Sequence, residues 1–324
     1  MNGEVVKEEL DGALADETFE VRYHGDGTAF FLLILKNVLL TVLTLGIYAA
    51  WAKTARRKFV WSNLEVHGQR LEYTGTGGEL FVGYLKVGLA YLVLFGIPGL
   101  LGALSPQVGA VAKIAGFVGV MAALPFAIYW SRRYLLSRTR WRGIRLGLTG
   151  EAKPYARQFW IGALLTVVTL GLYAPIMGNR LRKIMTDATN LGDQPFHYDG
   201  KDGEVFRIAL KGFFLTLVTL GIYYPWFAVA LARYVFEHTR FQGARGRFTL
   251  SGADAFMLFM LNAFGTTLTL GIAFPWIATY TLKELCGHVQ LRGQIDFERV
   301  MQRASSGNAA ADGMADAMGV DLGL

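Results

Sequence analysis

One apolar string recurs along the chain, and this recurrence constrains the fold more than any other feature. The string reads LLTVLTLGIYAAW at 39–51, LLTVVTLGLYAPI at 164–176, FLTLVTLGIYYPW at 214–226 and GTTLTLGIAFPW at 265–276. Its glycines Gly171, Gly221 and Gly271 are 50 residues apart. A fixed period is typical of one supersecondary unit that is copied and packed against its own copies.

Two further sets of positions have the same period. Basic residues follow the apolar segments at Lys58, Arg133, Lys183, Arg233 and Lys283, with spacings of 75, 50, 50 and 50 residues. Strand-like positions precede the segments at Tyr23, Tyr73, Leu148, Tyr198 and Phe248. The pattern predicts five units at about 23–72, 73–147, 148–197, 198–247 and 248–300, with an extra apolar segment in the second unit.

Each unit is expected to contain a strand, a glycine turn, an apolar helix, a basic helix and a second strand. Segments such as 64–78 and 241–252 alternate in side-chain character and carry a glycine at the centre. Alternation around a central glycine is typical of a β-hairpin. Short hairpins are therefore expected to join consecutive units, in one shared environment.

Apolar segments of spanning length predict a membrane protein. Hydrophobic residues make up 53% of the chain and charged residues 18%, whereas a soluble domain carries about 25% charged residues. Six segments approach the roughly 20 helical residues that cross a bilayer: 29–51, 81–104, 108–130, 159–178, 205–232 and 255–281. The expected fold is a mainly α, polytopic membrane domain over 18–303, built of five repeats of a broken apolar helix plus a basic helix joined by short β-hairpins. It is flanked by an acidic disordered stretch, 1–17, and a disordered tail, 304–324.

The repeated Thr-Leu-Gly string, the basic residues after it and the short hairpins resemble the YjgN-like family of bacterial inner-membrane proteins. The resemblance covers roughly residues 18–300. It implies a multi-pass protein of the bacterial cytoplasmic membrane and no particular activity, because the family has no established function. The second unit lacks the string, and the first unit has Ala50 where proline stands in other copies.

The net charge of +7 predicts lipid rather than nucleic acid as the partner, because the basic residues follow apolar segments. Basic residues beside membrane segments are retained on the cytoplasmic side and contact anionic headgroups. A homo-oligomer or an unknown membrane partner is also compatible with the sequence. The five histidines and one cysteine form no ligand or nucleophile motif, so we expect no catalytic residue, no cofactor and no metal.

Glycine and proline are expected to break the apolar helices, because proline removes a backbone donor and glycine adds conformational freedom. The predicted breaks are at Gly46, Gly171, Pro175, Gly221, Pro225, Gly271 and Pro275. Such breaks are either packing kinks or, as in transporters, the places where a substrate or an ion binds.

Threonines and basic residues are the candidate functional groups. Threonine pairs share a helix face at i and i+3 and could line a polar path: Thr41, Thr44, Thr166, Thr169, Thr216, Thr219, Thr266 and Thr269. They could equally bond to their own helix or join helices together. Candidate contacts for an anion or lipid are Lys36 and Lys211, together with the five basic residues of the period.

Carboxylates are missing from the apolar segments, with no Asp or Glu at 80–150, 152–186, 205–236 or 255–283. Intramembrane carboxylates mark proton and cation pathways, so a cation transporter is not expected. The leading hypothesis is a transporter or channel-like conduit for an anionic or neutral small solute or lipid. The alternative is a non-catalytic, membrane-anchored structural or interaction module that binds a protein partner or lipid headgroups.

Two topologies remain open. In one, units one, three, four and five turn back at the Gly-Pro break, the second unit crosses the membrane and returns through the extra segment 81–104, and every hairpin lies on the cytoplasmic side. In the other, each segment is a single kinked span, which puts hairpins 1, 2 and 4 on one face and hairpins 3 and 5 on the other.

Overall fold

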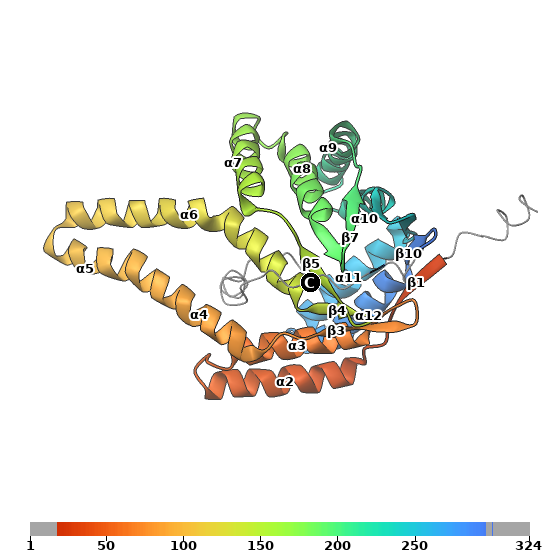
Figure 1. Cartoon of the computed structure of the whole chain (residues 1–324), viewed down its shortest axis with the longest axis horizontal. Coiled ribbons are helices and arrows are strands. Elements are labelled where there is room, and N and C mark those ends of the chain that lie inside the picture. The colour runs from red at the N-terminus through yellow and green to blue at the C-terminus, as the bar shows by residue number, and fades with distance from the viewer. Residues whose placement is uncertain (1–17, 296–299, 301–324) are drawn as a thin grey trace, which may run out of the picture.

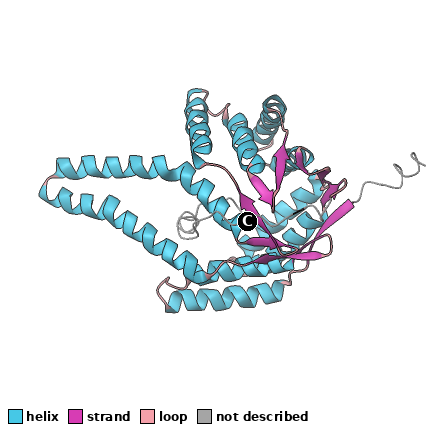
Figure 2. Ribbon diagram, viewed as in Figure 1, coloured by secondary structure: helices cyan, strands magenta, loops and turns pink. Residues whose placement is uncertain are grey.

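Short antiparallel strands close into a barrel at the centre of the molecule (Figures 1 and 2). The computed structural model describes residues 18–295 and residue 300. Its strands are β1 (Thr18–Tyr23), β2 (Leu64–Val66), β3 (Gln69–Tyr73), β4 (Thr139–Trp141), β5 (Ile144–Leu148), β6 (Thr189–Leu191), β7 (Gln194–Tyr198), β8 (Thr239–Phe241), β9 (Ala244–Phe248) and β10 (Val289–Arg292). Each strand pairs with its neighbours in sequence, and β1 pairs with both β2 and β10 to close the ring.

Apolar residues occupy the inner face of the barrel. Trp141, Leu191 and Phe241 lie on β4, β6 and β8, yet they form one buried cluster with Val300. Strands so far apart in the ring share a cluster only if these side chains point inward. The alternate positions point outward: on β9, Arg245 and Arg247 are exposed between buried neighbours. This alternation is the two-residue period of a strand with one wet face.

The barrel has two different rims, one formed by the tight turns between paired strands and the other by the connections to the helices. The tight turns at one rim include His67–Gly68 and Arg142–Gly143, in which both residues have positive φ. Positive φ at both central residues is the turn geometry that matches the twist of paired strands. The other rim carries the helices, because each strand there is followed or preceded directly by one.

The helices leave this second rim in pairs and return to it (Figure 1). They are α2 (Gly27–Leu43), α3 (Ala49–Asn63), α4 (Gly77–Tyr91), α5 (Ile97–Leu104), α6 (Pro106–Ser137), α7 (Ala152–Val168), α8 (Ala174–Asp187), α9 (Asp202–Val218), α10 (Tyr224–Glu237), α11 (Gly252–Leu268) and α12 (Phe274–Gly287). A π-helical turn, η1 (Leu92–Gly96), joins α4 to α5. The four short hairpins are α2–α3, α7–α8, α9–α10 and α11–α12, and the long hairpin is α4–η1–α5 with α6.

The Thr-Leu-Gly string ends the first helix of each short hairpin. Leu45 has φ 50° and Gly46 has φ 93°, and the Gly46 amide donates to the Thr41 carbonyl at 2.8 Å. A left-handed residue pair with this bond closes a helix C-terminus. The same bond recurs from Gly171, Gly221 and Gly271, so four helices end at the same point of the string.

The helix pairs also form a ring. The second helix of each pair packs against the first helix of the next, and α12 packs against α2. A tryptophan ring lies against a glycine at these junctions, where an added Cβ would lie within 2.5 Å of the ring: Trp51 at Gly77, Trp226 at Gly252 and Trp276 at Gly27. The last contact joins the two ends of the described chain.

The prediction of a mainly α, polytopic fold with six apolar segments of spanning length is wrong. Only Gly77–Leu104 and Pro106–Ser137 are long and apolar enough to cross a membrane among the described helices. The remaining segments are each divided into two shorter helices by the left-handed Leu-Gly turn. Proline does not kink these helices either; Pro175, Pro225 and Pro275 begin the second helix, where a missing amide costs nothing. The hairpins expected between units close into a barrel, which the sequence analysis did not predict.

Candidate functional site

The tips of the short hairpins are apolar and almost fully exposed. Leu45, Leu170, Leu220 and Leu270 are 94%, 95%, 93% and 92% exposed. They stand at the end of helices whose own apolar side chains are exposed, such as Leu43 at 77% and Val218 at 78%. Monomeric soluble proteins rarely expose large continuous apolar patches, so these tips are candidate contacts for an apolar partner or for lipid.

The threonines of the string serve the turn. Thr44 donates to the Leu40 carbonyl at 2.7 Å and accepts the Tyr48 amide at 3.0 Å. The second threonine of each other pair, Thr169, Thr219 and Thr269, makes the equivalent two bonds. The hydroxyl therefore closes one helix and begins the next.

The first threonine of each pair varies in its contacts. Thr41 and Thr166 donate to backbone carbonyls four residues earlier, both at 2.7 Å. Thr216 has a buried hydroxyl without a hydrogen-bond partner. These hydroxyls lie within four separate hairpins, so the polar path stays a prediction.

The periodic basic residues lie on the second helices, and two of them bind the barrel. Lys183 Nζ donates to the Tyr198 carbonyl at 2.7 Å and pairs with Asp187 at 3.1 Å. Arg233 donates to the carbonyls of Phe248 and Leu250, at 3.3 and 2.9 Å. These bonds fix helices α8 and α10 against β7 and the end of β9.

The other basic candidates are distributed rather than gathered. Lys36 and Lys211 are exposed on the first helices α2 and α9, and Lys58 and Lys283 are exposed on α3 and α12. Arg133 is half-buried on α6. The structure therefore does not bring the seven predicted anion or lipid contacts together.

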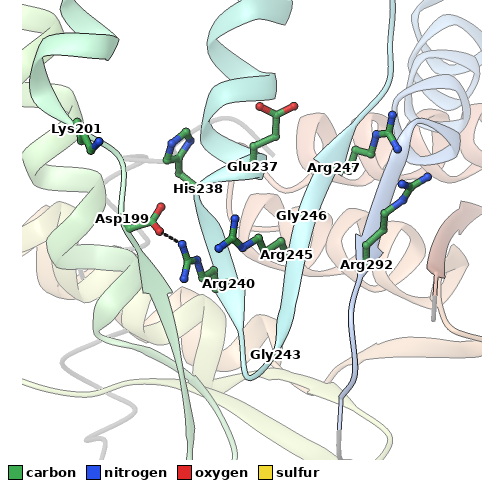
Figure 3. A pocket seen from close by; sticks show the side chains of 10 residues that line it. All are labelled: Asp199, Lys201, Glu237, His238, Arg240, Gly243, Arg245, Gly246, Arg247 and Arg292. Atoms are coloured by element: carbon green, nitrogen blue, oxygen red, sulfur yellow. Dashed lines mark ion pairs between the residues drawn. The ribbon is translucent and has the colours of Figure 1, made fainter. Parts of the chain in front are cut away.

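A basic pocket of about 790 Å³ lies on the outer side of β8, β9 and β10 (Figure 3). Its lining residues are Asp199, Lys201, Glu237, His238, Arg240, Gly243, Arg245, Gly246, Arg247 and Arg292. Five of these residues are basic and two are acidic, so the pocket favours an anion. None of the five was singled out from the sequence, although the alternation of arginine in TRFQGARGRF was the signal that could have identified this face.

Local contacts hold the pocket together at the helical rim. Arg240 forms an ion pair with Asp199. The Lys201 amide donates to the Tyr234 hydroxyl at 2.7 Å, and the His238 ring stacks on Tyr234 with centroids 3.9 Å apart. These contacts fix the loop before α9 against the end of α10.

Buried tyrosines support the same rim from inside. The Tyr198 hydroxyl donates to Asn179 Oδ1 at 2.7 Å, and its burial raises its pKa. Burial raises the pKa of Tyr23 to about 12. Both phenols stay neutral at physiological pH. Tyr198 packs and hydrogen-bonds, whereas Tyr23 only packs, because its buried hydroxyl has no hydrogen-bond partner in the described structure.

The described histidines make local contacts. Within the described ranges no group of three His, Cys, Asp or Glu side chains could hold a metal ion. His238 and His288 each bond to a carbonyl four residues earlier, at 2.8 and 2.7 Å. His24 and His197 pair with Glu65 and Asp187 at the barrel surface.

Comparisons with known proteins place the chain in a family. A family model described as "Bacterial protein of unknown function (DUF898)" matches residues 18–214, 193–252 and 227–317. The inner membrane protein YjgN of Escherichia coli K12 is 32% identical over 146 residues, which is 45% of this chain and 34% of that protein. The inner membrane protein YjgN of Salmonella typhimurium is 31% identical over 157 residues, which is 47% of this chain and 36% of that protein.

The chain thus spans about a third of the length of these curated relatives. No solved structure matches the chain. The family model covers most of the barrel and its helices, and the curated relatives are named inner membrane proteins. The chain therefore belongs to the DUF898 family of bacterial proteins, a YjgN-like inner-membrane family of unknown function.

Proposed function

We propose that the protein is a non-catalytic module of the bacterial inner membrane, which inserts its helical hairpins into the bilayer and holds the barrel at the cytoplasmic surface. The observation that carries the proposal is the set of leucine tips, each more than nine-tenths exposed. An exposed leucine on a left-handed turn is favourable in lipid and unfavourable in water. The names of the relatives, inner membrane proteins, support the location.

Helix length supports partial insertion of the short hairpins. Their first helices have 17 residues, or about 25 Å at 1.5 Å per residue. A bilayer core is about 30 Å thick, and the basic ends of the second helices remain at the barrel. The short hairpins therefore enter the membrane and return to the same side.

Charge supports the cytoplasmic side for the barrel. Its outer face carries arginines on β1, β3, β4, β5, β8, β9 and β10. Basic residues close to membrane segments are retained in the cytoplasm, where anionic headgroups attract them. In this position the barrel is a platform for lipid headgroups or for an anionic partner.

The conduit hypothesis has less support. Large apolar side chains, including Trp141 and Phe241, fill the described interior of the barrel. The threonine hydroxyls that would line a path are mostly bonded within their own hairpins. We therefore favour the membrane module over transport of a solute.

Cysteine labelling tests the side on which the barrel lies. In a Cys286→Ser background, cysteines at Gln69 and His197 place thiols on exposed strand positions of two hairpins. We expect both to be protected from an impermeant maleimide in intact cells and labelled in inverted vesicles. Labelling of either cysteine in intact cells would overturn the proposal.

A further inference from the structure

We propose that the pocket on β8, β9 and β10 binds a multiply charged, phosphate-bearing anion, which is an inference beyond the membrane module itself. The pocket is large for a single ion, at about 790 Å³, and lies in the size range of small-molecule sites. It holds four arginines and a lysine. Arginine binds phosphate through paired N–H groups in a fixed plane.

Three of the arginines stand in one row across three strands. Arg245 on β9 is directly opposite Arg240 on β8 and directly opposite Arg292 on β10. Figure 3 shows these side chains on the outer side of the strands, with Arg247 further along β9. Like charges in directly opposed positions are destabilising, so an anion between them would relieve a cost that the free protein carries.

Compensation within the described chain is incomplete. Arg240 is paired with Asp199, yet its Nε is buried without a hydrogen-bond partner. Across the described part of the chain, no hydrogen bond or ion pair engages the side chains of Arg245, Arg247 and Arg292. Glu237 adds one negative charge at the rim, which leaves the row short of anionic partners.

The other hairpins show that the fold does not need this arrangement. The pair next to the turn is Arg240 with Arg245 in the β8–β9 hairpin and Arg140 with Arg145 in β4–β5, but Glu65 with Arg70 in β2–β3 and Asn190 with Pro195 in β6–β7. In the β4–β5 hairpin an acidic residue, Glu72 on β3, is directly opposite Arg140. The same backbone register therefore accepts opposite charges or no charge. The barrel therefore does not require arginine at these positions. The row of Arg240, Arg245 and Arg292 differs from the β4–β5 pair because no carboxylate is directly opposite it: Arg240 is opposite His197, and Arg245 is opposite Arg292.

The pocket is open to two sources of phosphate. It runs from the turn residue Gly243 to Lys201 and His238 at the helical rim. Its shared chemistry suits the phosphate of an anionic lipid headgroup that approaches from the rim, and it suits a soluble phosphorylated compound equally. The test must separate these two sources.

Calorimetry on the full chain in nanodiscs provides the test, with inorganic pyrophosphate as the soluble probe. In phosphatidylcholine nanodiscs we expect saturable binding that weakens at least about tenfold in an Arg245→Gln, Arg292→Gln variant, as expected for lost charge-assisted bonds. The matched control is Arg22→Gln, Arg70→Gln, which removes two exposed arginines from β1 and β3. This control should retain affinity within about twofold, because long-range charge effects are screened by salt.

Phosphatidylglycerol in the nanodisc separates the sources. If a headgroup occupies the pocket, this lipid weakens pyrophosphate binding, and native mass spectrometry finds it retained by the wild type more than by the pocket variant. If a soluble compound is the ligand, pyrophosphate binding is unchanged by the lipid. The thermal unfolding midpoint of the pocket variant should not fall, because a like-charge row has been relieved. Equal weakening in both variants, or no saturable pyrophosphate binding and no selective lipid retention, would overturn the proposal.

Discussion

The long hairpin and the four short hairpins begin at the same rim of the barrel but end differently. A short hairpin has a first helix of 17 residues and turns at a left-handed Leu-Gly pair. The long hairpin lacks that string; its first arm covers 28 residues and α6 has 32. Its turn is made at Ser105, where the N-terminus of α6 carries Pro106.

This difference teaches that the turn motif sets the length of each hairpin. Where the Thr-Leu-Gly string is present, the first helix ends after 17 residues. Where the string is lost, the helix continues, and a glycine-packed partner returns the chain to the rim. The second unit therefore keeps its place in the barrel while its helices reach much further (Figure 1).

Accessibility of the tips gives the largest contrast between the two kinds of hairpin. In a Cys286→Ser background, a cysteine at Leu104 should react with an impermeant maleimide in intact cells, because the long arms span about 42 Å. Cysteines at Leu45 and Leu220 should react from neither side, since their tips end within the bilayer core. Labelling is read by gel shift in intact cells and in inverted vesicles.

Two outcomes would break this distinction. Labelling of a cysteine at Leu220 from outside the cell would mean that the short hairpins cross. Failure of Leu104→Cys to react in intact cells, while reacting after the membrane is dissolved, would mean that the long hairpin does not cross.

The sequence predicts a break at the turn but leaves open whether the chain turns back there or continues as one kinked span. Gly171, Gly221 and Gly271, which are 50 residues apart, have positive φ in the turns between the paired helices. Each of these apolar segments continues through the turn, so two helices have the length of one apparent span. Hydropathy cannot distinguish the two cases, because a left-handed leucine at a hairpin tip is as apolar as a leucine in a helix.

Closure of the barrel and the basic pocket were harder to predict. Closure depends on pairing between β1 and β10, whose residues lie at opposite ends of the described chain. No local pattern carries that contact, although Trp276 lies against Gly27 in the same way as Trp51 lies against Gly77. The pocket depends on the neighbouring positions of Arg245 and Arg292 across strands, which only the register reveals.

Close packing in the long hairpin gives the next contrast. A Cβ on Gly109 would lie 2.3 Å from the Gly102 Cα. Gly109→Ala should therefore separate α5 from α6 and lower the free energy of unfolding by about 2 kcal/mol, within the range for overpacking. Chemical unfolding in detergent micelles, followed by tryptophan fluorescence, measures the change.

Gly88→Ala is the matched control on the same hairpin. No heavy atom lies within 4 Å of the Cβ that it would add, and alanine favours a helix by about 0.5–1 kcal/mol over glycine. The control should therefore be neutral or stabilising. Equal destabilisation by both substitutions would show that the arms are not held by this close approach.

The smallest expected effect concerns the two threonines of one short hairpin. They occupy one helix face, but their replacement by valine should change the free energy of unfolding by different amounts. Thr219 accepts the Tyr223 amide at 3.0 Å and donates to the Leu215 carbonyl. Thr219→Val leaves that amide without its cap, so the free energy of unfolding should fall by about 1 kcal/mol, as for other lost helix caps.

Thr216 has a buried hydroxyl without a hydrogen-bond partner. Thr216→Val should therefore be neutral or slightly stabilising, because removing an unsatisfied polar group costs no bond. Unfolding in micelles measures both variants, and Thr169→Val, which loses the same cap at Tyr173, should match Thr219→Val. A larger loss at Thr216 than at Thr219 would contradict the capping role and return the first threonine to the hypothesis of a polar path, which vesicle flux of an anionic or neutral solute would then test.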